Sequence, residues 1–137
     1  MIPKPKREEW VSTRTLPEKL AIRAGSKVLL VGIDDDWFRD LLRQCEAEVE
    51  HAETAVDFDL IFFRVESTTN LGRLLELRQL LKADGAIWVL RRKGSGRVVE
   101  QSDTMEAGKA AGLVDVKVVS FSPDESAEKY VIPLAQR

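Results

Sequence analysis

Three consecutive aspartates, Asp34, Asp35 and Asp36, are the first residues in the sequence whose types and spacing suggest chemistry. They follow Lys27–Gly32, a run of the kind that forms a buried parallel strand. In a nucleotide-binding fold the loop after such a strand is rich in glycine, because backbone N–H groups must approach a phosphate or a carboxylate closely. Here Gly32 alone remains and the aspartates offer the opposite charge, so this loop predicts no anion cradle.

A basic and flexible segment, residues 91–97, is the second candidate. In a doubly wound sheet, ligands bind beyond the carboxyl ends of the strands. If one strand separates the first and fourth strands, this segment faces the aspartates at about 10 Å. In one interpretation the two loops pair with each other or are solvated, and one of the aspartates caps the following helix. In the other, Arg91, Arg92, Lys93 and the flexible Gly94-Ser95-Gly96 form an anion-binding loop for a phosphate or a nucleotide.

Two further residues extend the candidate site. Glu53 lies about twenty residues after Gly32, near the spacing at which an acid binds a ribose hydroxyl in dinucleotide-binding folds. An exposed strand end is the alternative explanation for Glu53. Arg64 follows the apolar run Phe58–Phe63 at the same edge of the sheet. The candidate ligand-binding residues are therefore Gly32, Asp34, Asp35, Glu53, Arg64, Arg91, Lys93 and Ser95, and no catalytic residue is assigned.

The sequence offers little for covalent catalysis or for a metal site. His51 is the only histidine, so a Ser-His-Asp triad would need serine and acid partners to converge on it. Cys45, the only cysteine, lies on the apolar stripe of an expected helix, which is typical of a small buried residue. A magnesium site on Asp34–Asp36 would need oxygen ligands from a second segment. Gly94-Ser95-Gly96 lacks the G-x-x-x-x-G-K-[ST] frame of a phosphate-binding Walker loop.

Length and charge limit the classes of partner. A chain of 137 residues forms one domain with a real core, and its net charge of −2 gives no support for nucleic-acid or anionic-membrane binding. Cys45 alone cannot form an internal disulfide. No apolar run follows Met1–Arg7, and none approaches the ~18 residues that span a bilayer. These features predict a cytoplasmic protein without a membrane segment. Whether its partner is another protein or a second copy of the chain stays open.

Periodicity divides the chain into an arm, residues 1–14, and one α/β domain, residues 15–137. Thr15-Leu16-Pro17-Glu18 predicts a capping box that opens a helix ending before Gly25. Helix and strand then alternate and close on two strands with a short connection, which must be antiparallel. The pattern predicts a doubly wound, mostly parallel sheet of about six strands with a C-terminal antiparallel hairpin. The expected strands are 27–32, 48–53, 58–63, 86–90, 114–121 and 129–134, and the expected later helices are 37–45, 67–81 and 103–111, the last with a capping box on Asp103 and Glu106.

Three segments resemble S-adenosylmethionine-dependent methyltransferases. Leu80–Val89 resembles the "LLKPGGxLxV" turn from helix to strand, Ala111–Val118 resembles the "aGF…v…v" entry into the penultimate strand, and Ile22–Leu29 is similar to the "ikpGxrVLdlG" lead-in. Their order resembles that of a small bacterial family of methyltransferase-like domains. The resemblance implies a methyltransferase-like three-layer sandwich over most of residues 15–134.

The sequence departs from that family where the family binds its cofactor. Of the "GxGxG" loop only Gly32 is retained. Residues 53–58 leave no room for the family's additional helix and strand, which form part of the adenosine pocket. Arg64–Ser67 stand in place of the "(D/N)PPY" catalytic signature of amino-group methyltransferases. The interpretation is a truncated, degenerate methyltransferase-like domain that has lost catalysis and serves as a binding or scaffold module, with no cofactor expected and S-adenosylmethionine not favoured.

Two alternatives stay open. In the first, the domain is a rewired enzyme or a binder of nucleotides or phosphorylated metabolites that uses the charged loops. In the second, it is a pseudo-receiver signalling domain, because Asp59–Phe63 resembles the strand that leads to the phosphoacceptor. Arg64 takes the acceptor's place, however, and an antiparallel terminal hairpin disfavours that topology.

Overall fold

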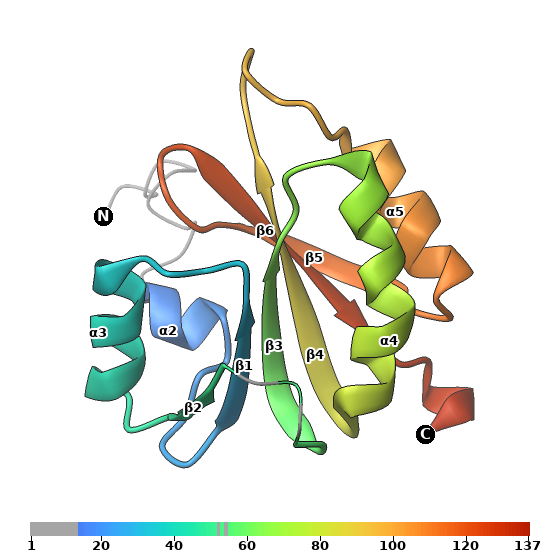
Figure 1. Cartoon of the computed structure of the whole chain (residues 1–137). Helices are drawn as coiled ribbons and strands as arrows, with labels where there is room; N and C mark the ends of the chain where they lie inside the picture. Colours follow the sequence, from blue (N-terminus) through green and yellow to red (C-terminus); the bar gives the residue numbers. More distant parts are fainter. Residues whose placement is uncertain (1–13, 52, 54) are drawn as a thin grey trace, which may run out of the picture.

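The apolar runs of the sequence form one six-stranded sheet, shown in the computed structural model of Figure 1. The structure describes residues 14–51, 53 and 55–137, so the predicted arm lies almost wholly outside the described residues. The strand order is β2-β1-β3-β4-β6-β5, and β6 is antiparallel to both of its neighbours while the other pairings are parallel. The predicted mostly parallel sheet with a C-terminal antiparallel hairpin is confirmed. The strands are β1 (Lys27–Val31), β2 (Glu48–Glu50), β3 (Phe58–Arg64), β4 (Leu81–Arg92), β5 (Val114–Ser120) and β6 (Glu125–Val131).

Helices cover both faces of the sheet, which confirms the three-layer arrangement. Figure 1 shows α2 and α3 on one face and α4 and α5 on the other. Within the described ranges, no helix is long and apolar enough to cross a bilayer. The described helices are α2 (Leu16–Lys19), α3 (Asp36–Gln44), α4 (Arg73–Leu80) and α5 (Gln101–Ala110), with the short 3-10 helices η1 (Thr68–Gly72) and η2 (Leu134–Gln136).

Alternating side chains along the two central strands build a core on each face. On β3, Ile61 and Phe63 pack on the α4 face while Leu60 and Phe62 pack on the α3 face, and all four are at most 5% exposed. β4 continues both cores, and its Trp88 is fully buried. Burial on both faces explains why these strands read as continuous apolar runs in the sequence.

The first helix is shorter than predicted. Its capping box is present, because the Glu18 N–H donates to Thr15 Oγ1 at 3.5 Å and the Thr15 N–H donates to Glu18 Oε1 at 3.2 Å. The predicted continuation toward Gly25 is wrong: the helix has four residues, and Ala21 takes a left-handed backbone conformation with a φ of 58°. The early turn accompanies complete burial of Leu20, so tertiary packing outweighs the local helical pattern here.

Several further boundaries differ from the prediction. β2 ends at Glu50 rather than at residue 53, α4 begins at Arg73 rather than at residue 67, and β4 begins at Leu81 rather than at residue 86. The capping box of α5 is formed by Glu100 and Asp103, three residues before the predicted pair of Asp103 and Glu106. Glutamate is an uncommon N-cap, which is why the same spacing was assigned to the wrong pair. The last strand begins at Glu125 rather than at Lys129, because its backbone pairs with the end of β4 from Arg92 onward despite its polar side chains.

The arrangement of the parallel strands gathers the candidate residues at one edge. β1, β3 and β4 end at that edge, and β3 lies between β1 and β4, as the predicted facing of the charged loops requires. β2 is an edge strand, and residues 51–57 lead from it to β3. Among the described residues the family's additional helix and strand are absent, so the fold is a truncated form of the methyltransferase-like sandwich.

Candidate ligand-binding edge

Arg64, the last residue of β3, is bound by carboxylates from two other segments. Its Nη1 and Nη2 donate to the two carboxylate oxygens of Asp35, in the loop after β1, at 2.8 and 3.0 Å. Its Nε and Nη2 donate to the two carboxylate oxygens of Glu125, the first residue of β6, at 2.9 and 2.7 Å. We call Arg64, Asp35 and Glu125 the Arg64 clamp. The clamp links the loop after β1 to β6, although β3 and β4 lie between those strands.

Burial and hydrogen bonding make the clamp a specific interaction. The side chains of Arg64, Asp35 and Glu125 are 17%, 31% and 16% exposed. Hydrogen bonds from Arg64 hold the pKa of the Asp35 carboxyl below its ordinary value, against the opposing effect of burial. Hydrogen bonds to Asp35 and then to Glu125 raise the pKa of the Arg64 guanidinium. Two carboxylates around one guanidinium leave the clamp itself with one negative charge in excess.

The clamp lies against Gly32. A Cβ added to Gly32 would lie 3.5 Å from the Arg64 carbonyl oxygen and 3.8 Å from the Arg64 Cβ. Asp34 and Asp36 are exposed and pair with an arginine of α3 at 2.9 and 2.8 Å. Asp35 holds the N-cap position of α3, but its side chain does not cap the helix, because both oxygens bind Arg64. In the described part of the chain, no three carboxylate, histidine or cysteine side chains gather as metal ligands would.

Arg91 belongs to a buried ion pair beneath α5. Its Nε donates to Glu128 Oε2 on β6 at 2.6 Å, and the two side chains are 11% and 2% exposed. The Glu128 carboxylate also contacts the hydroxyl of Thr104 on α5 and accepts from the Tyr130 hydroxyl at 3.3 Å. Burial raises the pKa of the Tyr130 phenol, so this group stays a neutral donor. Arg91 thus has a structural partner that the sequence did not reveal, and its contact with a ligand stays a prediction.

The other basic residues after β4 lie in an exposed loop. Lys93 Nζ donates to a serine of β5 at 2.9 Å, and Arg97 pairs with Glu100 at 2.9 Å. Ser95 is exposed. Arg91, Lys93, Arg97 and Glu100 line a shallow hollow of about 270 Å³ at the start of α5. The ion pairs of residues 14–51, 53 and 55–137 include none between this loop and the three aspartates.

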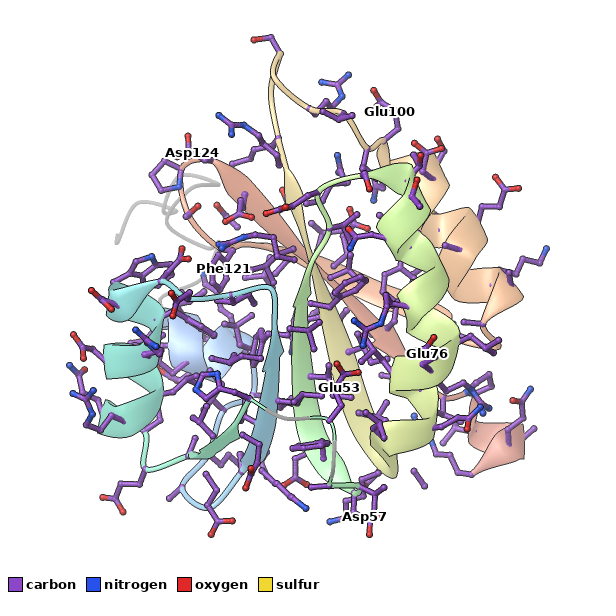
Figure 2. The ribbon with its side chains drawn as sticks, viewed as in Figure 1. Glu53, Asp57, Glu76, Glu100, Phe121 and Asp124 are labelled. Atoms are coloured by element: carbon purple, nitrogen blue, oxygen red, sulfur yellow. The ribbon has the colours of Figure 1, made fainter. Side chains whose placement is uncertain are left out.

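Glu53 lies away from the other candidate residues. It forms an ion pair with Arg73, the first residue of α4, and the two side chains are 36% and 34% exposed. In the view of Figure 2, Glu53 lies well below the loops at the carboxyl edge of the sheet, where Asp124 and Glu100 are labelled. The ion pair gives Glu53 a surface partner, and its predicted contact with a ribose stays untested.

A cavity of about 370 Å³ lies beside the clamp. Arg64 and Glu125 form part of its lining, whereas the loop after β1 contributes no lining residue. Its other charged lining residues are Glu66, Arg92 and Asp124. Arg92 belongs to the basic segment that the sequence predicted as an anion-binding loop, whereas Glu66 and Asp124 were not predicted. Glu66 follows the end of the buried parallel strand β3, which is the signal that could have identified it. Asp124 could not be found in this way, because it reaches the edge through the antiparallel hairpin.

Comparison with known proteins assigns the family. The model of the family described as "Protein of unknown function (DUF3052)" matches residues 17–133. The chain belongs to this DUF3052 family. The matched region contains the Arg64 clamp, the cavity and the Arg91–Glu128 pair. No curated protein matches the chain.

Solved structures share the fold of this DUF3052 chain. A protein of Sulfolobus solfataricus, described as a candidate type 11 methyltransferase, is 12% identical with a TM-score of 0.65 over 96% of this chain and 95% of that one. The pyocyanin biosynthetic protein PhzM is 12% identical with a TM-score of 0.62 over 86% of this chain and 53% of that one, so the chain spans about half the length of PhzM. Fibrillarin of Aeropyrum pernix is 14% identical with a TM-score of 0.56 over 82% of this chain and 69% of that one. The predicted methyltransferase-like fold is confirmed.

The same structures bear on the cofactor prediction. The fibrillarin of Aeropyrum pernix was solved with natively bound S-adenosyl-L-methionine. The comparisons therefore do not support the prediction that this cofactor is not used. At 14% identity the likeness shows the fold alone. Whether this DUF3052 chain binds the cofactor depends on its own edge residues.

Proposed function

We propose that the chain is a methyltransferase-like binding module that neither takes up S-adenosylmethionine nor transfers a methyl group. The observation that carries this proposal is the Arg64 clamp. In doubly wound sheets the ligand lies beyond the carboxyl ends of the strands. In this chain Arg64 lies there, bound by the carboxylates of Asp35 and Glu125, and its Cβ would be 3.8 Å from a Cβ added to Gly32.

The chemistry of the clamp opposes a cofactor in that position. To bind there, a cofactor would displace Arg64 from two carboxylates and break four charge-assisted hydrogen bonds. Asp35 and Glu125 would then be left partly buried without their cation, which is costly.

Titration calorimetry and thermal shift with S-adenosylmethionine and with its demethylated product test the proposal. A ligand present at about 100 times its Kd adds about 2.7 kcal/mol to the free energy of unfolding. A Kd of about 10 µM would therefore raise the melting temperature by several degrees at about 1 mM ligand. We expect no heat of binding and no shift. A low-micromolar Kd for either compound contradicts the proposal.

The hollow at the start of α5 favours a second candidate function, the binding of phosphate or a nucleotide. Arg91, Lys93 and Arg97 line it together with Glu100. Thermal shift with inorganic phosphate and with ATP tests this candidate in the double variant Lys93→Glu, Arg97→Glu. Arg91 is kept in that variant, because it neutralises the buried Glu128. A ligand-induced shift of the same size in the native chain and in the double variant rules out the hollow as the site.

The topology weighs against the pseudo-receiver alternative. A receiver-like sheet of the doubly wound type has the strand order 2-1-3-4-5. Here β6 lies between β4 and β5 and is antiparallel to both. Phosphorylation by acetyl phosphate is therefore expected to fail, with Arg64 in the place of the acceptor.

A further inference from the structure

The cavity beside the clamp has the size and place of a small-molecule site. Its volume of about 370 Å³ lies toward the lower end of the ~300–1,000 Å³ range of ligand pockets. It is formed at the ends of β3 and β4 and at the turn before β6, the edge at which doubly wound sheets bind ligands. Figure 2 shows Asp124 at this edge.

The charged residues of the cavity differ in whether they have a partner. Arg64 and Glu125 bind each other within the clamp. Glu66, Arg92 and Asp124 are exposed, and none of their side chains has an ion pair or a hydrogen bond with another described residue. Two carboxylates and one guanidinium therefore remain available to a ligand.

The three available charges alternate along the edge. Glu66 follows β3, Arg92 ends β4 and Asp124 precedes β6, and these strands are adjacent in the order β3-β4-β6. The backbone N–H of Lys93 donates to the Asp124 carbonyl at 2.9 Å, which holds the turn beside the end of β4. The Nε of Arg92 lies 3.5 Å from the position of a Cβ added to Gly96, so the Arg92 side chain runs along the loop that lines the cavity. Arg92 thus projects from the strand that lies between the strands bordered by the two acids.

We propose that this cavity binds a basic α-amino acid, such as lysine, ornithine or arginine. Such a ligand has one carboxylate and two cationic groups, the reverse of the charges that the cavity offers. Arg92 suits the carboxylate, because a planar guanidinium binds it in bidentate geometry. Val65, Val98 and Val99 supply an apolar wall for the aliphatic chain, and Val98 is 73% exposed. The inference rests on the proposed binding module and names the class of its ligand.

Titration calorimetry of the whole 137-residue chain with L-lysine and two analogues separates the contacts. Norleucine lacks the side-chain ammonium group, and cadaverine lacks the carboxylate. Loss of a charge-assisted hydrogen bond weakens binding about tenfold or more. We expect L-lysine to bind at least about tenfold more tightly than either analogue. No heat with lysine, ornithine and arginine, or equal affinity for lysine and both analogues, overturns the inference.

Three conservative variants assign the contacts to residues. Arg92→Gln should weaken the binding of lysine about tenfold and leave the binding of cadaverine unchanged, because cadaverine has no carboxylate. Glu66→Gln and Asp124→Asn should each weaken the binding of both lysine and cadaverine. All three side chains are exposed, so the fold is expected to tolerate the changes. Arg43→Gln on α3, whose ion pair with Asp40 is exposed, is the matched control and should bind as the native chain does. A lysine affinity that survives all three cavity variants overturns the assignment.

S-adenosylmethionine also carries one carboxylate and two cationic groups, so it is titrated in parallel. Lysine binding without cofactor binding supports both proposals. Binding of both compounds contradicts the proposed function and supports the cavity assignment. If neither compound binds, the cavity assignment alone is contradicted. If the cofactor binds and lysine does not, both proposals are contradicted.

Discussion

Replacing Arg64 by glutamine tests whether the clamp stabilises the fold. The substitution leaves Asp35 and Glu125, which are 31% and 16% exposed, without their cation. Removing one partner of a fully buried ion pair costs about 3–5 kcal/mol. Because both carboxylates keep some contact with water, we expect Arg64→Gln to lower the free energy of unfolding by about 2–3 kcal/mol.

Urea unfolding followed by circular dichroism measures this loss. For a domain of this size a loss of 1 kcal/mol lowers the melting temperature by roughly 3–5 °C, so a decrease of roughly 6–15 °C is expected. The control is Arg43→Gln, because the Arg43 side chain is 77% exposed in its pair with Asp40. This substitution should change the free energy of unfolding by less than about 0.5 kcal/mol. A loss of less than about 0.5 kcal/mol for Arg64→Gln would refute the reasoning.

The pH dependence checks the same prediction independently. Arg64 lowers the pKa of Asp35 below its ordinary value of 3.8. A carboxyl whose pKa is lower in the folded state stabilises the fold above its unfolded pKa, and this contribution is lost as the pH falls through the folded pKa. The difference in free energy of unfolding between the native chain and Arg64→Gln should therefore be full at about pH 7 and shrink below about pH 4. A difference that stays constant down to about pH 2 contradicts the assigned cause.

Two further predictions concern the packing under α5, and urea unfolding measures both. A Cβ at Gly108 would lie 2.5 Å from Tyr130 Cε1. Gly108→Ala should therefore lower the free energy of unfolding by about 1–2 kcal/mol, despite the better helix propensity of alanine. An unchanged free energy of unfolding would show that the Tyr130 ring can move aside. Arg91→Gln leaves Glu128, which is 2% exposed, without its cation, so it should lower the free energy of unfolding by about 3–5 kcal/mol. Lys93→Gln should change the free energy of unfolding by less than about 0.5 kcal/mol. Equal effects of the Arg91 and Lys93 substitutions would contradict the structural role given to Arg91.

Signals within short stretches of sequence predicted the elements, whereas contacts between distant segments were not predictable. Thr15 and Glu18 are three residues apart, and their capping box forms as predicted. Arg64 and Glu125 are 61 residues apart, and they meet only because the antiparallel hairpin folds back beside β4. No periodicity encodes such a pair, so Arg64 was selected for its place at the strand end and Glu125 was missed.

The basic run after β4 shows how strand geometry divides residues that the sequence presents together. Arg91 and Arg92 are consecutive in an extended strand, so their side chains leave opposite faces of the sheet. Arg91 shares the face of Val89 and reaches the buried Glu128 beneath α5. Arg92 leaves the other face and lines the cavity. The single predicted anion-binding loop is thus two different features, one structural and one available to a ligand.

The charges at the carboxyl edge differ in what they have left to bind, and this difference locates the function we propose. Beside the loop after β1, the Arg64 guanidinium and the carboxylates of Asp35 and Glu125 already neutralise one another, so a ligand there would have to replace these contacts. Beneath α5, the Arg91 guanidinium is committed to Glu128 in a site that water barely reaches. Over β3 and β4, Arg92 and the acids on either side of it have no protein partner among the described residues. A charged ligand gains most where the protein has not already neutralised its own groups, so we expect the ligand of this domain over β3 and β4 rather than over β1.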